Sequence, residues 1–423
     1  MKKHPIEHVI VTGGTGYIGK RLVKAALDSG CEVTLLGRGR KSFAHRNLRY
    51  IAWTLGESLP AEAIDSGIEP SAQALVHLAH DWKNRPGAKG TEGELNIEGT
   101  RALVEQARKL GLGRIVFASS QSARADAANI YGRVKWAIEQ LLDRPNEVSA
   151  RIGLVYGGPQ QAMYGLLSKL SGISPILPMV DPRRPVQPIH IDESAEGLLR
   201  LTSSDHVGWV GLASVKSVPF GDFLKALARE LHGTGLLIIP IPIQLALRVC
   251  DLTAKIPFVP TVDRERVLGL AGTRLMQCAD HLTSLGLEIE EYESRLAFEP
   301  GARRTLLLEG GILLRYVMNA WPDHSLLRLY VRSLRVRGIR QAIAMPRTVR
   351  LLPSLLRLME PFDQKAALSR RLAIAVAIAQ SSPQGELVLS RNGTLARNVA
   401  VFLDITVDTI ALPIRILFRR LWS

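Results

Sequence analysis

Two side chains that could share a proton-transfer step, Tyr131 and Lys135, lie four residues apart in the segment YGRVK. On a helix this spacing places both side chains on one face. A free tyrosine has a pKa of about 10. Lowering it by about 3 units requires the surroundings to stabilise the phenolate over the phenol by about 4 kcal/mol. We expect the ammonium group of Lys135 to supply this, so that Tyr131 can exchange a proton with a hydroxyl or carbonyl group.

A third polar group should come from the segment FASSQSA, which offers Ser119, Ser120 and Ser122. These serines follow an apolar, β-branched stretch at 114–119 that is typical of a buried strand. Ligand crevices of parallel α/β proteins lie at the carboxyl ends of the strands, where a serine hydroxyl can hold a substrate oxygen. The alternative is that the tyrosine, the lysine and the serines are ordinary structural residues.

A glycine-rich loop, TGGTGYIG at 12–19, precedes these groups in the chain and contains Gly13, Gly16 and Gly19. It lies between a predicted strand at 8–12 and a predicted helix at 17–29. The first glycine permits a tight turn, the second lets the backbone approach a pyrophosphate, and the third allows close helix–strand packing. The loop therefore predicts a dinucleotide site that also includes its residues Thr15, Tyr17 and Ile18. The alternative is a glycine turn that binds nothing.

Residues that follow the second strand of such folds determine whether NAD or NADP is preferred. In NAD-specific proteins a carboxylate there binds the ribose 2′-hydroxyl. This chain has Gly-Arg-Gly-Arg-Lys at 37–41 instead, with no carboxylate. The guanidinium of Arg38 suits a 2′-phosphate through two parallel hydrogen bonds. We therefore favour NADP(H) over NAD(H) and include Arg38 in the cofactor site, the alternative being that these arginines only form a solvated loop.

Strand and helix patterns alternate along the first part of the chain, which is typical of a parallel sheet covered on both faces. We predict strands at 8–12, 32–36, 49–53, 74–79, 114–119 and 148–154, and helices at 17–29, 95–110 and 131–143. The fold class is α/β, a Rossmann-type doubly wound parallel sheet with a small substrate-binding region and an extra C-terminal helical segment. We place the cofactor-binding domain at 1–300, its substrate-binding part at about 155–300, and a separate region at 301–423.

Seven motifs occur in an order that resembles the extended short-chain dehydrogenases/reductases, the NAD-dependent epimerase/dehydratase group. They are TGGTGYIG (12–19), HLAH (77–80), NIEGT (96–100), FASS (117–120), YGRVK (131–135), RIGLVYGGP (151–159) and PIHIDE (188–193), and CADHLTSLGLEIEEYESRL (278–296) resembles the closing segment of the group. The resemblance covers about residues 6–298. It implies fold and cofactor much more specifically than it implies the substrate.

The resemblance assigns roles to residues. Ser120 matches the residue that polarises the substrate, Tyr131 the acid/base, and Lys135 the lysine that binds the nicotinamide ribose and tunes the tyrosine. Leu78 and Ala79 match the strand end beside the adenosine ribose. Asn96 matches a structural asparagine, with a helix cap as the alternative, and His190 matches a position that usually packs.

The resemblance implies an NAD(P)-dependent enzyme that acts at a hydroxyl or carbonyl carbon, with a nucleotide sugar as one substrate. Several departures weigh against the sugar: Thr54 stands where the group has an aspartate near the adenine, and PVQPIH replaces the Arg-Asp that precedes the histidine in sugar epimerases. The run IPIPIQLAL (239–247) is similar to redox or lipid-linked members. One alternative is therefore an NADPH-dependent reductase of a small or lipid-linked carbonyl, and another is a non-catalytic dinucleotide-binding scaffold at a membrane or complex.

The net charge of +15 is concentrated in residues 301–423, where 19 Lys and Arg face 7 Asp and Glu, a net +12. Segments 305–319 and 325–340 read as amphipathic helices, with Arg328, Arg332 and Arg335 on one face. This region is either a helical subdomain packed on the core or a peripheral contact with an anionic membrane, to which Trp321 and Trp422 would contribute. Nucleic acid is not expected, because leucines separate the arginines and no nucleic-acid module is visible.

Other features bound the class of protein. The three cysteines lack CxxC spacing, so neither a disulfide framework nor a metal site is expected. A cytoplasmic location is expected, with or without contact at the inner membrane face. The resemblance also implies a homodimer as one arrangement.

Overall fold

The computed structural model describes residues 6–38, 45–82, 93–253, 267–269, 272–296, 300–318, 321–339, 342–343, 345, 349, 355–356 and 366–381. The basic pair Arg40 and Lys41 and the tryptophan Trp422 lie outside these residues. The chain divides into two compact units. The first unit spans 1–166, 178–222 and 240–292, and the second spans 167–177, 223–239 and 293–423.

The helices and strands follow the alternation that the sequence predicts. The strands are β1 (His8–Thr12), β2 (Glu32–Gly37), β3 (Leu48–Ala52), β4 (Gln73–His77), β5 (Arg114–Ser120), β6 (Glu147–Ile152), β7 (Leu154–Tyr156), β8 (Ile176–Met179), β9 (Pro185–Val186), β10 (Pro188–His190), β11 (Gly208–Leu212), β12 (Val218–Pro219) and β13 (Leu237–Pro240). The helices are α1 (Tyr17–Asp28), α2 (Glu94–Lys109), α3 (Ile130–Glu139), α4 (Ala162–Ile173), α5 (Ile191–Thr202), α6 (Phe220–His232), α7 (Ile243–Thr253), α9 (Ala279–Ser284), α10 (Tyr292–Leu296), α11 (Pro300–Met318), α12 (His324–Val336) and α15 (Ala366–Gln380), with short 3₁₀ turns at Ala61–Ala63 and Pro70–Ala72.

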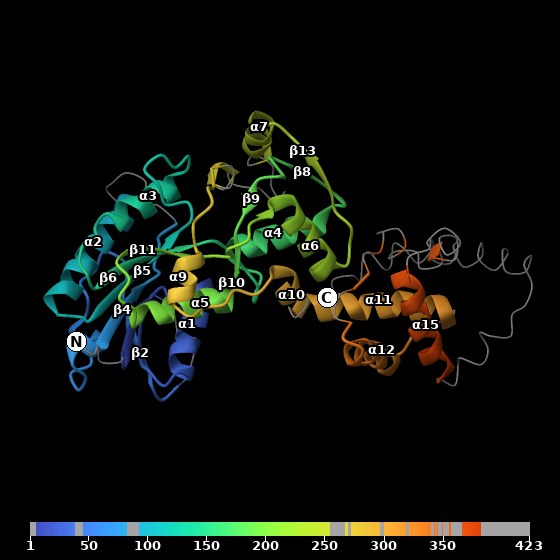
Figure 1. Ribbon diagram of the computed structural model, residues 1–423, viewed down its shortest axis with the longest axis horizontal. Helices are drawn as coiled ribbons and strands as arrows, with labels where there is room; N and C mark the ends of the chain where they lie inside the picture. The colour runs from blue at the N-terminus through green and yellow to red at the C-terminus, as the bar shows by residue number, and fades with distance from the viewer. Residues whose placement is uncertain are drawn as a thin grey trace, which may run out of the picture. The chain divides into compact units, whose positions relative to one another are not determined.

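A seven-stranded parallel sheet is the centre of the first unit (Figure 1), as far as the described residues show. Its strand order is β11-β6-β5-β4-β1-β2-β3, so that β1 lies between β2 and β4. In register, His8 pairs with Glu32 on one side and with Gln73 on the other. The chain order reverses between β1 and β4, and in doubly wound sheets ligands bind beside this point. The predicted Rossmann-type fold is confirmed.

Two apolar layers cover the two faces of the sheet, with α1 and α5 on one face and α2 and α3 on the other (Figure 1). Because successive strand side chains point to opposite faces, Val9 and Val11 pack toward α1, whereas Ile10 packs toward α2. All three are fully buried. The strands are apolar on both faces for this reason, and they hold the carboxyl edge of the sheet in a fixed position.

Within the sheet-containing unit, two predicted elements differ most from the structure, and the others differ by at most two residues at either end. Helix α3 ends at Glu139 rather than at 143, because the next N–H groups turn back over three residues, from Leu142 to the carbonyl of Glu139 for example. The predicted strand 148–154 is divided at Gly153 into β6 and β7. A side chain at Gly153 would come within 2.7 Å of Ala213, so the chain changes direction where only glycine fits.

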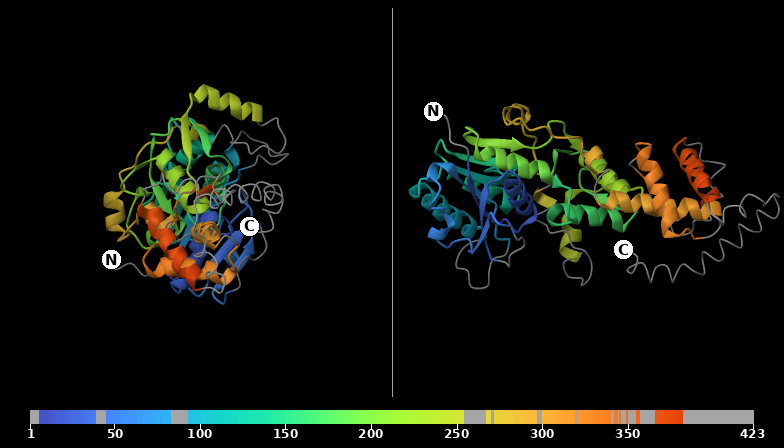
Figure 2. Two further views of the ribbon diagram at one scale, coloured as in Figure 1. Left: turned by 90° about the vertical axis from the view of Figure 1, so that its right-hand side faces the viewer. Right: turned by 90° about the horizontal axis from the view of Figure 1, so that it is seen from below.

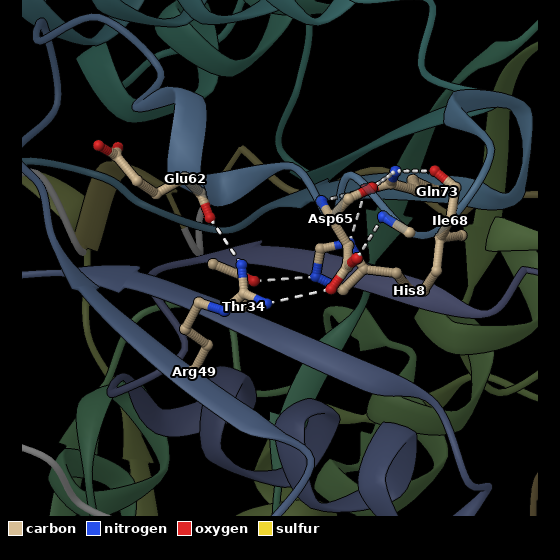
Figure 3. Close-up of polar contacts among 8 residues, drawn as sticks. His8, Thr34, Arg49, Glu62, Asp65, Ile68 and Gln73 are labelled. Carbon is tan, nitrogen blue, oxygen red and sulfur yellow. Dashed lines mark hydrogen bonds and ion pairs between the residues drawn. The ribbon is translucent and has the colours of Figure 1, made fainter.

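A polar network closes the amino end of the sheet (Figure 3), at the opposite edge from the predicted site. The ring of His8 contacts Gln73 Oε1 through Nδ1 at 2.7 Å and Thr34 Oγ1 through Nε2 at 2.8 Å. Gln73 donates to the backbone of the 65–68 turn, and Asp65 accepts from Arg49 at 3.0 Å. Burial lowers the pKa of His8, so the imidazole joins β1, β2 and β4 as a neutral group.

Three helices, α11, α12 and α15, pack together in the second unit (Figures 1 and 2). Their shared core includes Leu313, Tyr330, Leu334 and Ala375, all fully buried. Buried among them, Glu309 accepts a hydrogen bond from the Tyr330 hydroxyl. The predicted C-terminal helical segment is therefore present, whereas a domain boundary at residue 300 stays a prediction. None of the helices in the described ranges is long and apolar enough to cross a membrane.

Candidate functional site

The glycine loop between β1 and α1 forms a turn against the end of β4. Gly13 has a φ of +68°, and a Cβ there would lie 2.7 Å from the backbone nitrogen of Ala79. A Cβ at Gly19 would lie 2.6 Å from Gly14 Cα. Only glycine fits these two positions, because backbone atoms rather than movable side chains occupy the space.

The loop fits the pyrophosphate of a dinucleotide. Gly16 precedes α1, no side chain caps this end of the helix, and its first turn holds no acidic residue. The N–H groups and the partial positive charge of a helix start favour an anion there. Thr15, Tyr17 and Ile18 are half-buried around this turn, and the Tyr17 hydroxyl donates to the carbonyl of Gly157. The predicted loop residues thus lie together in one cradle.

Thr12 and His77 hold the end of β4 beside this cradle. The hydroxyl of Thr12 lies 2.6 Å from His77 Nδ1 and accepts the N–H groups of Leu78 and Ala79, both at 3.2 Å. Burial lowers the pKa of His77 to about 3, so the ring is neutral. The strand end predicted to lie beside the adenosine ribose is therefore fixed by buried hydrogen bonds.

Ser120 and Tyr131 meet where β5 ends and α3 begins. Asn129 caps α3 by accepting the N–H of Gly132 at 3.2 Å, which places Tyr131 in the first turn. The Ser120 hydroxyl lies 3.0 Å from that of Ser122 and hydrogen-bonds the phenol of Tyr131. Ser119 instead donates to Glu139. Of the three candidate serines, Ser120 is thus joined to the tyrosine, and Ser122 is joined to Ser120.

Lys135 lies one turn after Tyr131 and is almost fully buried. Its ammonium donates to the carbonyl of Ala118 at 2.7 Å and lies 4.5 Å from the centre of the Phe117 ring. Burial lowers the pKa of Lys135 to about 7, against which the carboxylate of Glu139 raises it. A fraction of Lys135 is therefore uncharged at neutral pH.

The expectation that Lys135 lowers the pKa of Tyr131 is wrong for this arrangement. Burial raises the pKa of Tyr131 to about 12, with the hydrogen bond from Ser120 acting in the opposite direction. The ammonium is 5.7 Å from the centre of the tyrosine ring and is directed to a backbone carbonyl. Desolvation of the phenolate therefore exceeds its attraction to the lysine, and Tyr131 remains a protonated donor.

Glu139, which the sequence reasoning did not single out, supports the lysine from the next turn of α3. Its carboxylate accepts three hydrogen bonds from Arg151, of which the shortest is 2.6 Å, and one from Ser119 at 2.5 Å. The sequence does carry a signal for this contact, because residues four apart on a helix, such as Lys135 and Glu139, lie on one face. These hydrogen bonds hold the carboxylate in place, so it raises the pKa of Lys135 from a fixed position.

An aromatic wall formed by His80 and Trp82 was also missed. The Trp82 indole stacks on the Tyr131 ring at 5.0 Å and an interplanar angle of 17°, and the edge of His80 lies 5.2 Å from the same ring. Burial lowers the pKa of His80 to about 3, whereas Trp82 is 71% exposed. The tyrosine is therefore flanked by uncharged, largely aromatic surface.

The remaining predicted residues divide between structural and exposed positions. Asn96 is structural and not a helix cap: its amide exchanges two hydrogen bonds with the backbone of Asp81, at 2.8 and 3.0 Å. His190 is buried and caps α5. Arg38 is exposed directly after β2, and Thr54 follows β3, where its N–H donates to Glu57.

The comparisons with known proteins agree with this geometry. Residues 9–148 match the model of the NAD dependent epimerase/dehydratase family. The chain is 28% identical to a ceramide reductase of Caulobacter vibrioides over 212 residues, 49% of this chain and 65% of the relative. It is 29% identical to a UDP-glucose 4-epimerase of Bacillus subtilis over 164 residues, 32% of this chain and 46% of the relative.

A solved structure shows the same fold. The UDP-glucose 4-epimerase of Thermotoga maritima, determined with UDP-glucose, superposes with a TM-score of 0.51 at 17% identity. The match covers 71% of this chain and 99% of the epimerase. The chain spans two thirds or less of the length of the two curated relatives. Together, the glycine cradle, the strand order and the family match show that residues 9–148 are similar to the NAD dependent epimerase/dehydratase family.

Proposed function

We propose that the protein is an NAD(P)-dependent enzyme that acts at a carbon bearing a hydroxyl or carbonyl group. The observation that carries this proposal is the contact of Ser120 with Tyr131, one helical turn before the buried Lys135, at the carboxyl edge of the sheet that holds the glycine cradle. When bound, the nicotinamide supplies or accepts a hydride. The residues of the chain then have to bind the substrate oxygen and move its proton.

Each residue has a separate part in this scheme. Ser120 donates a hydrogen bond to the substrate oxygen, and Tyr131 transfers a proton to or from it. Lys135 holds the end of β5 through the carbonyl of Ala118 and offers its remaining N–H groups to the cofactor ribose. A phenol with its pKa raised to about 12 is protonated at neutral pH, which supports proton donation, the direction of carbonyl reduction.

A net reductase of an apolar, lipid-linked carbonyl is the first candidate. The wall beside Tyr131 is uncharged, because burial keeps His80 neutral, and Trp82 presents a largely exposed indole. Such a surface suits an apolar chain better than a polar sugar. The similarity to a protein named ceramide reductase supports the same substrate class.

A nucleotide-sugar epimerase or dehydratase is the second candidate, in which the hydride returns and no net oxidation occurs. Arg124, Arg184 and Arg274 lie near one another: burial lowers the pKa of Arg124, and the positive charges of the other two lower it further. Arg124 and Arg274 share the carboxylate of Asp126, which leaves the group an excess of positive charge for a diphosphate. The similarity to a UDP-glucose 4-epimerase supports this candidate.

One assay separates the candidates. The full chain is incubated either with NADPH or NADH and a keto-lipid in detergent micelles, or with NADP+ or NAD+ and UDP-glucose. Stoichiometric loss of the reduced cofactor with the keto-lipid supports the reductase, whereas conversion of the sugar without net cofactor change supports the epimerase. If neither substrate nor any other carbonyl or alcohol in a panel is converted while the cofactor binds, the enzymatic proposal is overturned.

Replacing Arg38 by alanine tests the preference for NADP(H). Loss of a charge-assisted hydrogen bond to the 2′-phosphate should lower kcat/KM for NADPH by about ten- to a hundredfold and leave NADH nearly unchanged. The measurement is the ratio of the two kcat/KM values. Arg46→Ala is the matched control, because Arg46 is exposed before β3, at the opposite edge of the sheet. An unchanged ratio in Arg38→Ala would contradict NADP selection by this residue.

Replacing Glu139 by glutamine tests the control of Lys135. The carboxylate raises the lysine pKa, so its removal should lower that pKa further below its ordinary value. If the charged lysine is the active form, activity falls as pH rises through this pKa, and in the variant the fall should begin at lower pH. Ser119→Ala is the control, since it removes one hydrogen bond to Glu139 without removing charge. A fall at the same pH in both variants would show that Glu139 does not tune the lysine.

A further inference from the structure

The outward face of α12 combines positive charge with exposed apolar side chains. Arg328, Arg332 and Arg335 are exposed, and so are Leu329 and Val336, at 42% and 81%. At about 100° per residue these five side chains fall within an arc of about 120°. The opposite face holds Leu326, Tyr330, Val331 and Leu334, which are buried in the core of the second unit. We call the five exposed residues the α12 outer face.

The positive charge of this face is not neutralised locally. The stretch 324–339 contains Arg328, Arg332, Arg335 and Arg337 and no acidic residue. Among the residues that the structure describes, none of these four guanidinium groups forms an ion pair. The acidic residue that precedes the helix, Asp323, is occupied as its cap, accepting the N–H groups of Ser325 and Leu326. Within the described part of the chain, the charge of the face is therefore available to an anionic partner.

The apolar members distinguish among anionic partners. A phosphate backbone would be bound by the arginines alone and would gain little from Leu329 and Val336. At a bilayer, arginines bind lipid phosphates while neighbouring apolar side chains enter the boundary of the acyl chains. Trp321, 60% exposed before the start of α12, lies under the guanidinium of Arg315, 4.1 Å from its ring. Tryptophan beside arginine is the composition favoured at a membrane interface.

We propose that the α12 outer face binds the surface of an anionic lipid bilayer. The arginines hold the lipid phosphates, and Leu329 and Val336 insert among the upper acyl segments. The contact is peripheral and does not depend on the proposed catalytic function. An enzyme attached in this way would meet lipid-linked substrates at the bilayer where they reside.

The test is flotation of the full chain with vesicles at physiological salt. One set contains phosphatidylglycerol and phosphatidylcholine in equal parts, and the other contains phosphatidylcholine alone. We expect the protein to float with the anionic vesicles and to remain at the bottom with the neutral ones. Replacing Arg328, Arg332 and Arg335 together by serine should lower the partition coefficient by about a hundredfold.

A matched control variant removes three positive charges from the first unit instead of from α12. Arg46, Arg101 and Lys109 are exposed in the first unit, and their joint replacement by serine should leave flotation nearly unchanged. Joint replacement of Leu329 and Val336 by serine should lower the partition about tenfold, because apolar burial is lost. Circular dichroism and thermal unfolding of each variant establish that the fold is intact.

Four results would overturn the proposal. The first is wild-type protein that fails to float with anionic vesicles, and the second is equal loss in the matched variant, which would reduce the effect to net charge. The third concerns nucleic acid. The face is a nucleic-acid site if the wild-type protein binds duplex DNA or RNA but does not float with vesicles, and if the arginine variant loses this binding while Leu329→Ser/Val336→Ser retains it. Inorganic phosphate that displaces the vesicles at millimolar concentration would show a simple phosphate site instead.

Discussion

Replacing Tyr131 by phenylalanine is expected to lower kcat by about a thousandfold or more while leaving cofactor binding intact, because a positioned acid contributes about 10²–10⁴ in rate. Phenylalanine keeps the ring that stacks on Trp82 and contacts His80, and it removes only the hydroxyl joined to Ser120. The loss should therefore appear in kcat rather than in the affinity for NADPH. Steady-state kinetics and a titration of NADPH fluorescence measure the two quantities.

The control for this variant is Tyr50→Phe. Tyr50 also loses one hydrogen bond, from its hydroxyl to the carbonyl of Gly37 at 2.6 Å, but it lies on β3, at the end of the strand order away from α3. The Tyr50→Phe variant should therefore have a kcat close to that of the wild type. Should Tyr131→Phe retain full biological activity with the cofactor still bound, catalysis would not be the task of the site, and the dinucleotide-binding scaffold would be the better description.

Replacing Gly13 by alanine is expected to weaken NADPH binding by more than about a hundredfold and to destabilise the fold by about 2–4 kcal/mol. Two effects add. The φ of +68° is strained for any residue with a Cβ, and that Cβ would lie 2.7 Å from Ala79 N and 2.8 Å from Leu78 C. The end of β4 would have to move away from the loop, taking part of the cofactor cradle with it. Thermal unfolding and NADPH titration measure the two losses.

Gly30→Ala separates backbone strain from the clash. Gly30 has a φ of +90°, but a Cβ there would meet nothing within 4 Å. This variant should lose only about 1–2 kcal/mol of stability through the unfavourable φ and should bind NADPH as the wild type does. If Gly13→Ala behaves like Gly30→Ala, close approach of the loop to β4 is not what the cradle requires.

The sheet could be predicted from sequence because its signals are local. An apolar strand, a glycine turn and an amphipathic helix follow one another within residues 8–28, and β1 and α1 begin where the pattern predicts. The order of Ser120, Tyr131 and Lys135 in the chain likewise predicted that they meet, because carboxyl strand ends and the next helix start share one edge of a parallel sheet. Errors arose at helix ends, as after Glu139, where tertiary packing of Leu142 ends the regular hydrogen bonding.

The electrostatics of the site could not be predicted in the same way. The spacing of Tyr131 and Lys135 gives proximity but not burial, and burial reverses the expected direction of the tyrosine pKa. The contact between Trp82 and Tyr131 joins residues 49 positions apart, one after β4 and the other in the first turn of α3, and no periodicity signals it. Glu139 had a usable signal in its spacing from Lys135, but its partner Arg151 comes from β6 and is known only from the fold.

We expect the neutral imidazoles on β1, at the end of β4 and just after it to make the protein less stable in acid. Burial lowers the pKa of His8, and it lowers those of His77 and His80 to about 3, whereas in the unfolded chain all three titrate near about 6.5. Below about pH 6.5 the unfolded chain binds protons at these rings and the native chain does not. The free energy of unfolding is therefore highest above this pH and falls as the solution is acidified, by up to about 1.4 kcal/mol per pH unit for each ring. Mildly acidic buffers or organelles would therefore shorten its lifetime, and neutral to alkaline conditions suit its storage and crystallisation.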